Sequence, residues 1–448
     1  MRTAFLRCAL ALALTALASG CALPPQAPLS EVRFAPVTLP RGVARSNQDL
    51  AEDFLDLTFA LESGDKLPHL LRYEGPIRVH LAPGLGRYRE DVETLLMRLR
   101  TEAGIDIAST PDADAAELHI EAVKADQLAR VFPSAACFIV PGETNWDEFL
   151  RRRPDTRSRW ARQTELTGAA IFVPSDTTPQ DVRDCLHEEI TQALGPANDL
   201  YRLPDTIWND DNLHGIATPF DMLILRLLYQ PELHSGMSRA EVAARLPKLL
   251  ARENPKGRGL PRRPRHPESR AWASAIEVAL NRRASREARL EAAQLAAQIA
   301  AEMRPVDHRL AVSLLTLGRL TLRQDPGASA QYFTEAYALS RRLYPQDRIR
   351  NAHAGVHVAA VALAAGQYDD TVKLAERHAP AAIAGQNAIL LAGLRSLQAE
   401  ALLGLGEAEA ARAARLDSLR WARYGFGDAD GSLAREQAAL DAMVREGG

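Results

Sequence analysis

The stretch "TTPQDVRDCLHEEITQALGPAND", residues 177–199, decides the fold class of the first half of the chain. Pro179 follows two threonines, and a proline at the first helical position behind a threonine cap is a typical helix start. Gly195 and Pro196 are typical of a helix end. The sequence therefore predicts a helix between Pro179 and Gly195.

One face of this expected helix is apolar, and one residue on that face is out of place. At about 100° per residue a single apolar stripe forms. It consists of Val182, Cys185, Leu186, Ile190 and Ala193. Glu189 lies inside the stripe, where a carboxylate has to be paired, protonated or functional. His187 lies on the far flank with no second imidazole one turn later, so we expect a surface histidine rather than a metal ligand.

The spacing of the same stretch follows the metzincin template H-E-x-x-H-x-x-G-x-x-H, in which three imidazoles bind a zinc ion. Glu189 takes the position of the catalytic glutamate, and Gly195 is kept. Glu188, Gln192 and Asn198 stand where the three histidines would be. Glu189 is therefore the candidate catalytic residue, and the fold expected around it is zincin-like.

Two neighbouring stretches fit this layout. "AAIFV", residues 169–173, is similar to the zincin edge strand, which can bind an extended peptide by strand addition. Met222 falls near an expected turn, at the place of the metzincin Met-turn; the alternative is a plain core methionine.

Without imidazoles, the candidate site offers mainly oxygen ligands. Asp199 and the "NDDN" run at residues 209–212 would suit Ca²⁺ or Mg²⁺, and His214 is the one imidazole that would restore zinc binding. We expect no metal and no cofactor. Glu189 is then a structural acid bonded to the backbone of the following loop, which we favour, or a general base whose pKa is raised by burial.

The residues of this region also resemble a family of proteobacterial lipoproteins, grouped as domain of unknown function 2927. The resemblance is carried by "CLHEEITQALGPANDLYRLPDTIWNDDN", "FDMLILRLLYQPELHSGMSRAEVAARLP" and "ARENPKG", and it covers residues 54–257. It implies an envelope domain that is often lipid-anchored and has no assigned activity.

The chain starts like a bacterial lipoprotein. Arg2 and Arg7 precede the apolar run "CALALALTALA", which is too short to span a membrane. "LASGC", residues 17–21, resembles a lipobox, which implies that residues 1–20 are removed and Cys21 is acylated. The alternative is an ordinary secretory signal that is cut elsewhere. Ala22 is not the aspartate typical of inner-membrane retention, so we expect an anchor in the outer membrane, facing the periplasm.

Two further cysteines remain in the expected mature chain. In an oxidising periplasm we expect a disulfide between Cys137 and Cys185 rather than two free buried thiols. This bond would pin the strand "ACFIV" to the helix that carries Glu189.

Composition divides the chain into segments. Residues 21–50 are rich in proline and predict a tether. Residues 51–253 mix alternating strands and amphipathic helices in the order strand, helix, three strands, helix, which predicts an α+β domain. Residues 254–269 are rich in Pro, Gly and Arg and predict a solvated linker; the alternative is an electrostatic contact with anionic lipid or cell-wall polymer.

Residues 270–445 predict an all-α helical-repeat domain. Turn signals at Ser285, Gly327, Gly366 and Gly406 recur roughly 40 residues apart, and each separates two amphipathic helices. This pattern resembles tetratricopeptide repeats and predicts stacked helical hairpins whose groove holds a protein or peptide partner. The alternative is a purely structural cap on the first domain.

These features predict a non-enzymatic envelope lipoprotein whose zincin-like domain binds peptides and whose repeats recruit a protein partner. The alternatives are an atypical hydrolase of peptide or peptidoglycan stems, with Glu189 as base, and a repeat protein whose first domain is only a spacer. The formal net charge of −3 argues against a general nucleic-acid binder. The sequence leaves the oligomeric state open.

Overall fold

The computed structural model describes residues 32–427, apart from residues 38, 134, 153–155, 210, 212 and 265–267 and the side chains of 156–158. The expected leader, the expected acylation site Cys21 and the end of the expected repeat region at 428–445 lie outside these residues. Among the described residues, no helix combines the length and apolar content that a membrane crossing requires.

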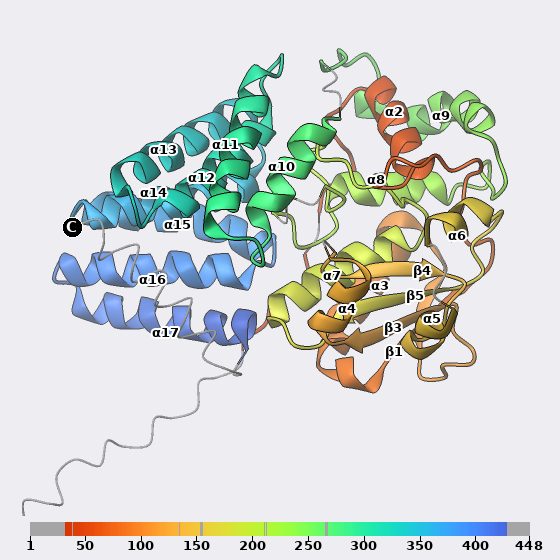
Figure 1. Ribbon diagram of the computed structural model, residues 1–448, viewed down its shortest axis with the longest axis horizontal. Coiled ribbons are helices and arrows are strands. Elements are labelled where there is room, and N and C mark those ends of the chain that lie inside the picture. Colours follow the sequence, from red (N-terminus) through yellow and green to blue (C-terminus); the bar gives the residue numbers. More distant parts are fainter. Residues whose placement is uncertain are drawn as a thin grey trace, which may run out of the picture. The chain divides into compact units, whose positions relative to one another are not determined.

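The first half of the described chain contains one mixed five-stranded sheet in the order β2-β1-β3-β5-β4 (Figure 1). β1, β2, β3 and β5 pair in parallel, and β4 runs antiparallel to β5. The elements are α2 (Asn47–Thr58), β1 (Ile77–Leu81), η1 (Pro83–Tyr88), α3 (Arg89–Arg98), η2 (Leu99–Ala103), β2 (Ile107–Thr110), β3 (Leu118–Val123), α4 (Ala125–Val131), β4 (Phe138–Pro141), α5 (Trp146–Arg152), α6 (Thr156–Arg162), β5 (Ala169–Pro174), α7 (Pro179–Gln192), α8 (Pro219–Leu228), α9 (Arg239–Glu253) and η3 (Pro255–Gly257).

Helices cover both faces of this sheet. Ala169, Ile171 and Val173 of β5 belong to the large core that also contains the apolar residues of α3 and α7. Ala170 and Phe172 point to the other face and form a second core with aromatic residues of α5. The expected mixture of strands and helices in the first half is confirmed. Parallel strands covered on both faces are an α/β arrangement, so only the α+β subtype was predicted incorrectly. The error arose because three short helices, α4 to α6, lie between strands that were expected to follow one another directly.

Two strand expectations need correction. β2 was missed, because "IAST" carries one buried apolar side chain and no alternation. β5 is not an edge strand: it pairs with β3 on one side and with β4 on the other. All six of its residues are buried, which is typical of a central strand and rules out strand addition to β5.

The folded part begins earlier and ends later than composition predicted. Ser46 caps α2 by accepting a hydrogen bond from the backbone of Asp49, so residues 46–50 are not part of a tether. Asn254, expected in the linker, is fully buried, and its side chain contacts Asn47 and the backbone of Val43. Both boundaries were misplaced because composition does not show that single polar side chains, such as those of Ser46 and Asn254, hydrogen-bond to the backbone and fix the chain in the fold.

The second half consists of eight described helices, and consecutive helices pack against each other. They are α10 (Arg270–Leu280), α11 (Arg286–Glu302), α12 (His308–Thr321), α13 (Pro326–Leu343), α14 (Arg348–Ala364), α15 (Tyr368–Ala384), α16 (Ala388–Gly404) and α17 (Ala408–Phe426). The turn at Gly366 has φ 70° and that at Gly406 has φ 82°, which is the left-handed conformation expected after a helix end.

Small residues set the spacing within these hairpins. A Cβ on Gly318 of α12 would lie 2.4 Å from the ring of Phe333 in α13, and one on Gly355 of α14 would lie 2.3 Å from His378 in α15. Both distances are far below van der Waals contact, so only glycine fits. The helical region is consistent with the repeat organisation that the recurrent turns predicted.

Candidate functional site

The helix α7 begins and ends where the sequence predicted. Thr178 caps it by accepting a hydrogen bond from Asp181, and Pro179 occupies the first helical position. Gly195 has φ 135°, and a Cβ there would lie 2.5 Å from the carbonyl oxygen of Leu71. Glycine is therefore needed at this position for both conformation and space.

The expected disulfide is present. Cys185 of α7 is bonded to Cys137, directly before β4, with Cα atoms 6.1 Å apart. The bond joins the helix to the antiparallel edge of the sheet. The prediction that this pair pins the strand to the helix is confirmed.

Glu189 is buried in the apolar stripe, with only 5% of its surface exposed. Burial, followed by repulsion from Glu62, raises its pKa to about 8, so the carboxyl group is mostly protonated at neutral pH. Among the described residues none donates a hydrogen bond to this carboxyl group, so the expected bond to the backbone of the 198–199 loop is absent.

Other acidic side chains gather at the same end of the helix. Burial raises the pKa of Asp199 well above its ordinary value, and repulsion from Glu188 and Glu62 adds to this effect. Gln192 donates to both carboxylate oxygens of Asp199, at 2.8 and 2.9 Å. We call Glu62, Glu188, Glu189, Gln192 and Asp199 the acidic end of α7. The structure thus brings together four of the residues that the sequence singled out, and adds Glu62.

Two residues that the sequence placed in the candidate site, Asn198 and His214, lie elsewhere. Asn198 donates a hydrogen bond to the backbone oxygen of Asp56 at 2.8 Å and anchors the loop to α2. His214 lies beside Asp347 of the helical region, with 3.7 Å between its Nε2 and a carboxylate oxygen. Of the "NDDN" run, Asp210 and Asn212 lie outside the described residues.

Met222 is not in a turn. It lies in the first turns of α8 and is buried in the large core. The positional analogy with a Met-turn is therefore wrong, and the alternative of a core methionine holds.

His187 is not on the surface, contrary to the wheel analysis. It is 6% exposed, and burial together with the nearby Arg98 and Arg183 lowers its pKa to about 3. It belongs to a second, polar stripe of α7, of which all members but the half-buried Asp184 are buried as well. This stripe consists of Gln180, Arg183, Asp184, His187 and Thr191.

The C-terminal helices cover part of this polar stripe. Arg183 stacks on the ring of Tyr424 in α17 at 4.0 Å and donates to its carbonyl oxygen. The side-chain oxygen of Gln180 accepts a hydrogen bond from the backbone of Ala388 in α16. A polar helix flank is expected to face water, whereas the polar flank of α7 faces a second group of helices.

The described residues of the 201–214 loop, between α7 and α8, contact the helical region, and we call their contacts with α12 and α14 the joint. Arg350 of α14, 2% exposed, forms ion pairs with Asp211 at 2.9 Å and with Asp347 at 3.1 Å. His308 of α12 contacts the carbonyl oxygen of Tyr201 at 2.6 Å, and His353 of α14 contacts that of Leu213 at 3.2 Å. The hairpins therefore hold a loop of their own chain.

The joint could not be predicted from the sequence. Its residues carry no motif, and their partners lie more than a hundred positions away. The available signal was histidine and arginine at helical spacing in "RIRNAHAGVH", residues 348–357, on a helix otherwise composed of small apolar residues.

In the part of the chain that the structure describes, no three or more His, Cys, Asp or Glu side chains are arranged to hold a metal ion.

Residues 47–248 match the model of a family described as "Protein of unknown function (DUF2927)". We call this part of the chain the DUF2927 domain after that match. It extends from the first residue of α2 into α9 and includes the sheet, α7 and the joint loop. No curated protein and no solved structure matches the chain.

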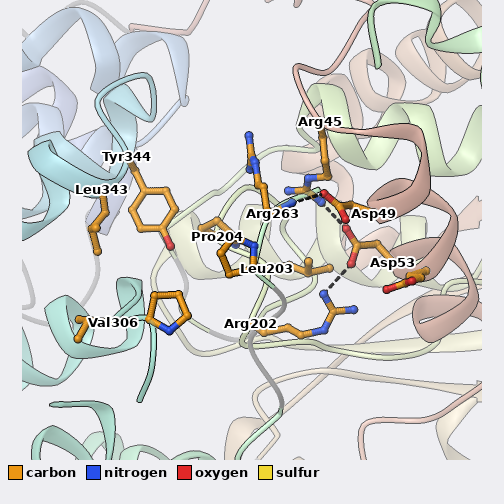
Figure 2. A pocket seen from close by; sticks show the side chains of 13 residues that line it. Arg45, Asp49, Asp53, Arg202, Leu203, Pro204, Arg263, Val306, Leu343 and Tyr344 are labelled. Atoms are coloured by element: carbon orange, nitrogen blue, oxygen red, sulfur yellow. Dashed lines mark hydrogen bonds and ion pairs between the residues drawn. The ribbon is translucent and has the colours of Figure 1, made fainter. Parts of the chain in front are cut away.

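A pocket of about 260 Å³ lies where the DUF2927 domain meets the helical region. Figure 2 shows Arg45, Asp49 and Asp53 on one side, Leu343 and Tyr344 on the other, and Pro204 and Arg263 between them. The DUF2927 domain, the segment after η3 and two loops of the helical region therefore contribute to one cavity.

Proposed function

We propose that this protein is a lipid-anchored envelope protein in which the DUF2927 domain and the helical hairpins together form a peptide-binding module. In this proposal Cys21 carries the anchor, and the folded part faces the periplasm from the outer membrane. Glu189 is a structural acid rather than a catalyst.

The composition of the acidic end of α7 carries this proposal. The side chains gathered around Glu189 are carboxylates and one amide, and the imidazole that the sequence offered, His214, lies in the joint. A hydrolase needs a positioned nucleophile or an activated water beside its base. Glu189 has only like-charged neighbours as electrostatic influences in the described structure, which favours a protonated and inert group.

A zincin-like ancestry is part of the same proposal. An antiparallel edge strand, β4, lies beside α7, and Gly195 bends the chain so that Asp199 returns to Gln192. In place of β5, β4 takes the role expected of the edge strand. The arrangement supports a peptidase-like scaffold whose metal-binding imidazoles are absent.

The tetratricopeptide-like assignment of the hairpins also belongs to this proposal. Their close helix spacing at Gly318 and Gly355 supports it. Because α12 and α14 already hold the joint loop, the hairpins contribute to binding together with the DUF2927 domain, not as a separate groove. The joint also speaks against the domain being a mere spacer.

A hydrolase with Glu189 as its base is the second candidate. One observation favours it: a buried carboxyl group without a hydrogen-bond donor and with a pKa of about 8 is poised to exchange a proton near neutral pH.

Purified full-length protein, prepared without chelator, separates the two candidates. We expect capture of photo-cross-linkable hexapeptides, and no cleavage of a fluorogenic peptide library or of isolated peptidoglycan stems in the presence of Mg²⁺, Ca²⁺ or Zn²⁺. Cleavage that is lost in Glu189→Gln would replace the proposal by the hydrolase. Fractionation of cells that express Cys21→Ser tests the anchor: the variant should leave the membrane fraction, and retention there would contradict lipidation.

A further inference from the structure

The pocket between the DUF2927 domain and the helical region contains three arginines, and two of them are already engaged. Arg45 is 3% exposed and pairs with Asp53 and Asp205. Arg202 is 7% exposed and pairs with Asp53 at 2.6 Å and Asp56 at 2.9 Å. Arg45 is fixed by two carboxylates and Arg202 by three, the third being Glu268, so neither is free to bind a ligand.

Arg263 differs from these two arginines. It is exposed, and its guanidinium group donates to the backbone oxygen of Ala44 at 3.0 Å. Asp49 accepts from the backbone N–H of Arg263 rather than from its side chain, and also from the side chain of Arg262. The guanidinium group of Arg263 also acts electrostatically on Asp205, without a hydrogen bond to it. Among the described pocket residues, Arg263 is therefore the cation with donors that face solvent and with no carboxylate bonded to its side chain.

The opposite wall of the pocket is largely apolar. Val306 and Leu343 line it, and Tyr344 adds an aromatic ring, while Pro204 lies between the two sides. Figure 2 shows Tyr344 and Leu343 across from the charged side and Arg263 between the two. One available guanidinium group opposite an apolar wall suits a carboxylate that stands next to an apolar side chain.

We infer that this pocket binds the carboxyl end of a short peptide, with the terminal carboxylate on Arg263 and the last side chain against Val306 and Leu343. The volume of about 260 Å³ is at the small end of ligand pockets, which suits one or two residues and excludes a long acyl chain. This inference rests on the proposed peptide-binding function and names its site and its ligand.

Calorimetric titration of the full-length protein with the tripeptide Ala-Ala-Leu tests the inference. We expect binding that weakens about tenfold or more when the peptide carries a C-terminal amide, because the charge-assisted pair is lost. The N-acetylated tripeptide should bind as well as the free one.

Variants locate the site. Arg263→Ala should weaken binding of the acid about tenfold without affecting the amide, and Arg263→Lys should restore part of it. Leu343→Ala should weaken Ala-Ala-Leu more than Ala-Ala-Ala. Arg258→Ala is the matched control, since it removes an exposed arginine of the same segment that does not line the pocket. Thermal melts verify that each variant is folded.

Equal affinity for acid and amide, or an Arg263→Ala variant that binds normally, would overturn the inference. Failure of Ala-Ala-Leu to bind would also overturn it. Capture of hexapeptides that is insensitive to Arg263→Ala would leave the proposed function standing and move its site elsewhere. Failure to capture any hexapeptide would contradict both the inferred site and the proposed peptide-binding function.

Discussion

The acidic end of α7 and the joint bury polar groups in opposite ways. At the acidic end, carboxyl groups face each other, and burial raises the pKa values of Glu189 and Asp199. At the joint, Arg350 is matched by Asp211 and Asp347, and burial keeps His308 and His353 neutral. Burial thus favours the protonated, neutral form of the acids in the first region and the deprotonated, neutral form of His308 and His353 in the second.

This difference teaches how pH acts on the protein. The folded chain binds the proton of Glu189 more tightly than the unfolded chain does, so this residue lowers the free energy of unfolding as pH rises from about 4.5 to 8. Burial holds the pKa of His308 at about 4, so the unfolded chain binds its proton more tightly, and stability falls as pH drops below 6.5. Glu189 therefore makes the folded chain more stable at low pH than at high pH, and His308 does the opposite.

Among the substitutions that test this comparison, loss of Arg350 should lower the free energy of unfolding most. Arg350→Ala leaves Asp211, which is 2% exposed at its side chain, without its closest cation. We expect the free energy of unfolding to fall by about 3–5 kcal/mol, measured by urea denaturation at pH 7. Lys373→Ala, which removes an exposed pair with Asp370, is the control and should change it by less than about 0.5 kcal/mol. A small effect of Arg350→Ala would mean that the joint does not hold the two halves together.

The two regions also differ in covalent bonding, because the disulfide lies near only one of them. It closes a sequence separation of 48 residues next to the acidic end, whereas the described contacts of the joint are noncovalent. The double variant Cys137→Ala/Cys185→Ala should lose about 2–4 kcal/mol of unfolding free energy, equally at pH 5 and pH 8. A loss confined to one pH would show that the bond acts through the nearby acids.

Glu189→Gln should stabilise the protein at high pH, because it removes the cost of a buried charge. We expect a gain of about 4 kcal/mol at pH 8 and little change at pH 4.5, in denaturation curves taken across this range. Glu291→Gln, at an exposed position of α11, should give no pH-dependent gain. A Glu189→Gln variant that is less stable at every pH would identify a bonded, ionised carboxylate.

His308→Gln should reduce sensitivity to acid at the joint. The amide can still donate to the carbonyl oxygen of Tyr201 but takes up no proton. Between pH 6.5 and 5 the variant should lose about 2 kcal/mol less than the wild type. The control His234→Gln, at an exposed position, should leave the dependence of unfolding free energy on pH unchanged. The same dependence in His308→Gln as in the wild type would show that His308 does not make the joint sensitive to acid.

The contrast between the two regions also explains what the sequence could predict. Local signals were reliable: the Thr178 cap, the turn glycines near the hairpin ends and the Cys137–Cys185 pair were all read from nearby residues or from compartment chemistry. The burial of Glu189 followed from the apolar stripe. These features depend on helix geometry and backbone conformation, which short stretches encode.

Long-range contacts could not be predicted in the same way. His187 looked exposed because periodicity cannot show that α16 and α17 cover the polar flank of α7. β5 was taken for an edge strand because strand order depends on pairings across the chain. The placement of His214 beside Asp347 depends on a partner 133 positions away, and no local pattern reports it.

A titration of the Glu189 side chain is the most direct test of the central claim, that the acidic end of α7 is a buried and protonated structural element. The ¹³C resonance of its carboxyl carbon, assigned by comparison with Glu189→Gln in protein labelled at glutamate, can be followed from pH 3 to pH 9.5. We expect a midpoint near 8. A midpoint at or below the ordinary value of 4.5 would show an ionised carboxylate at neutral pH and contradict the account.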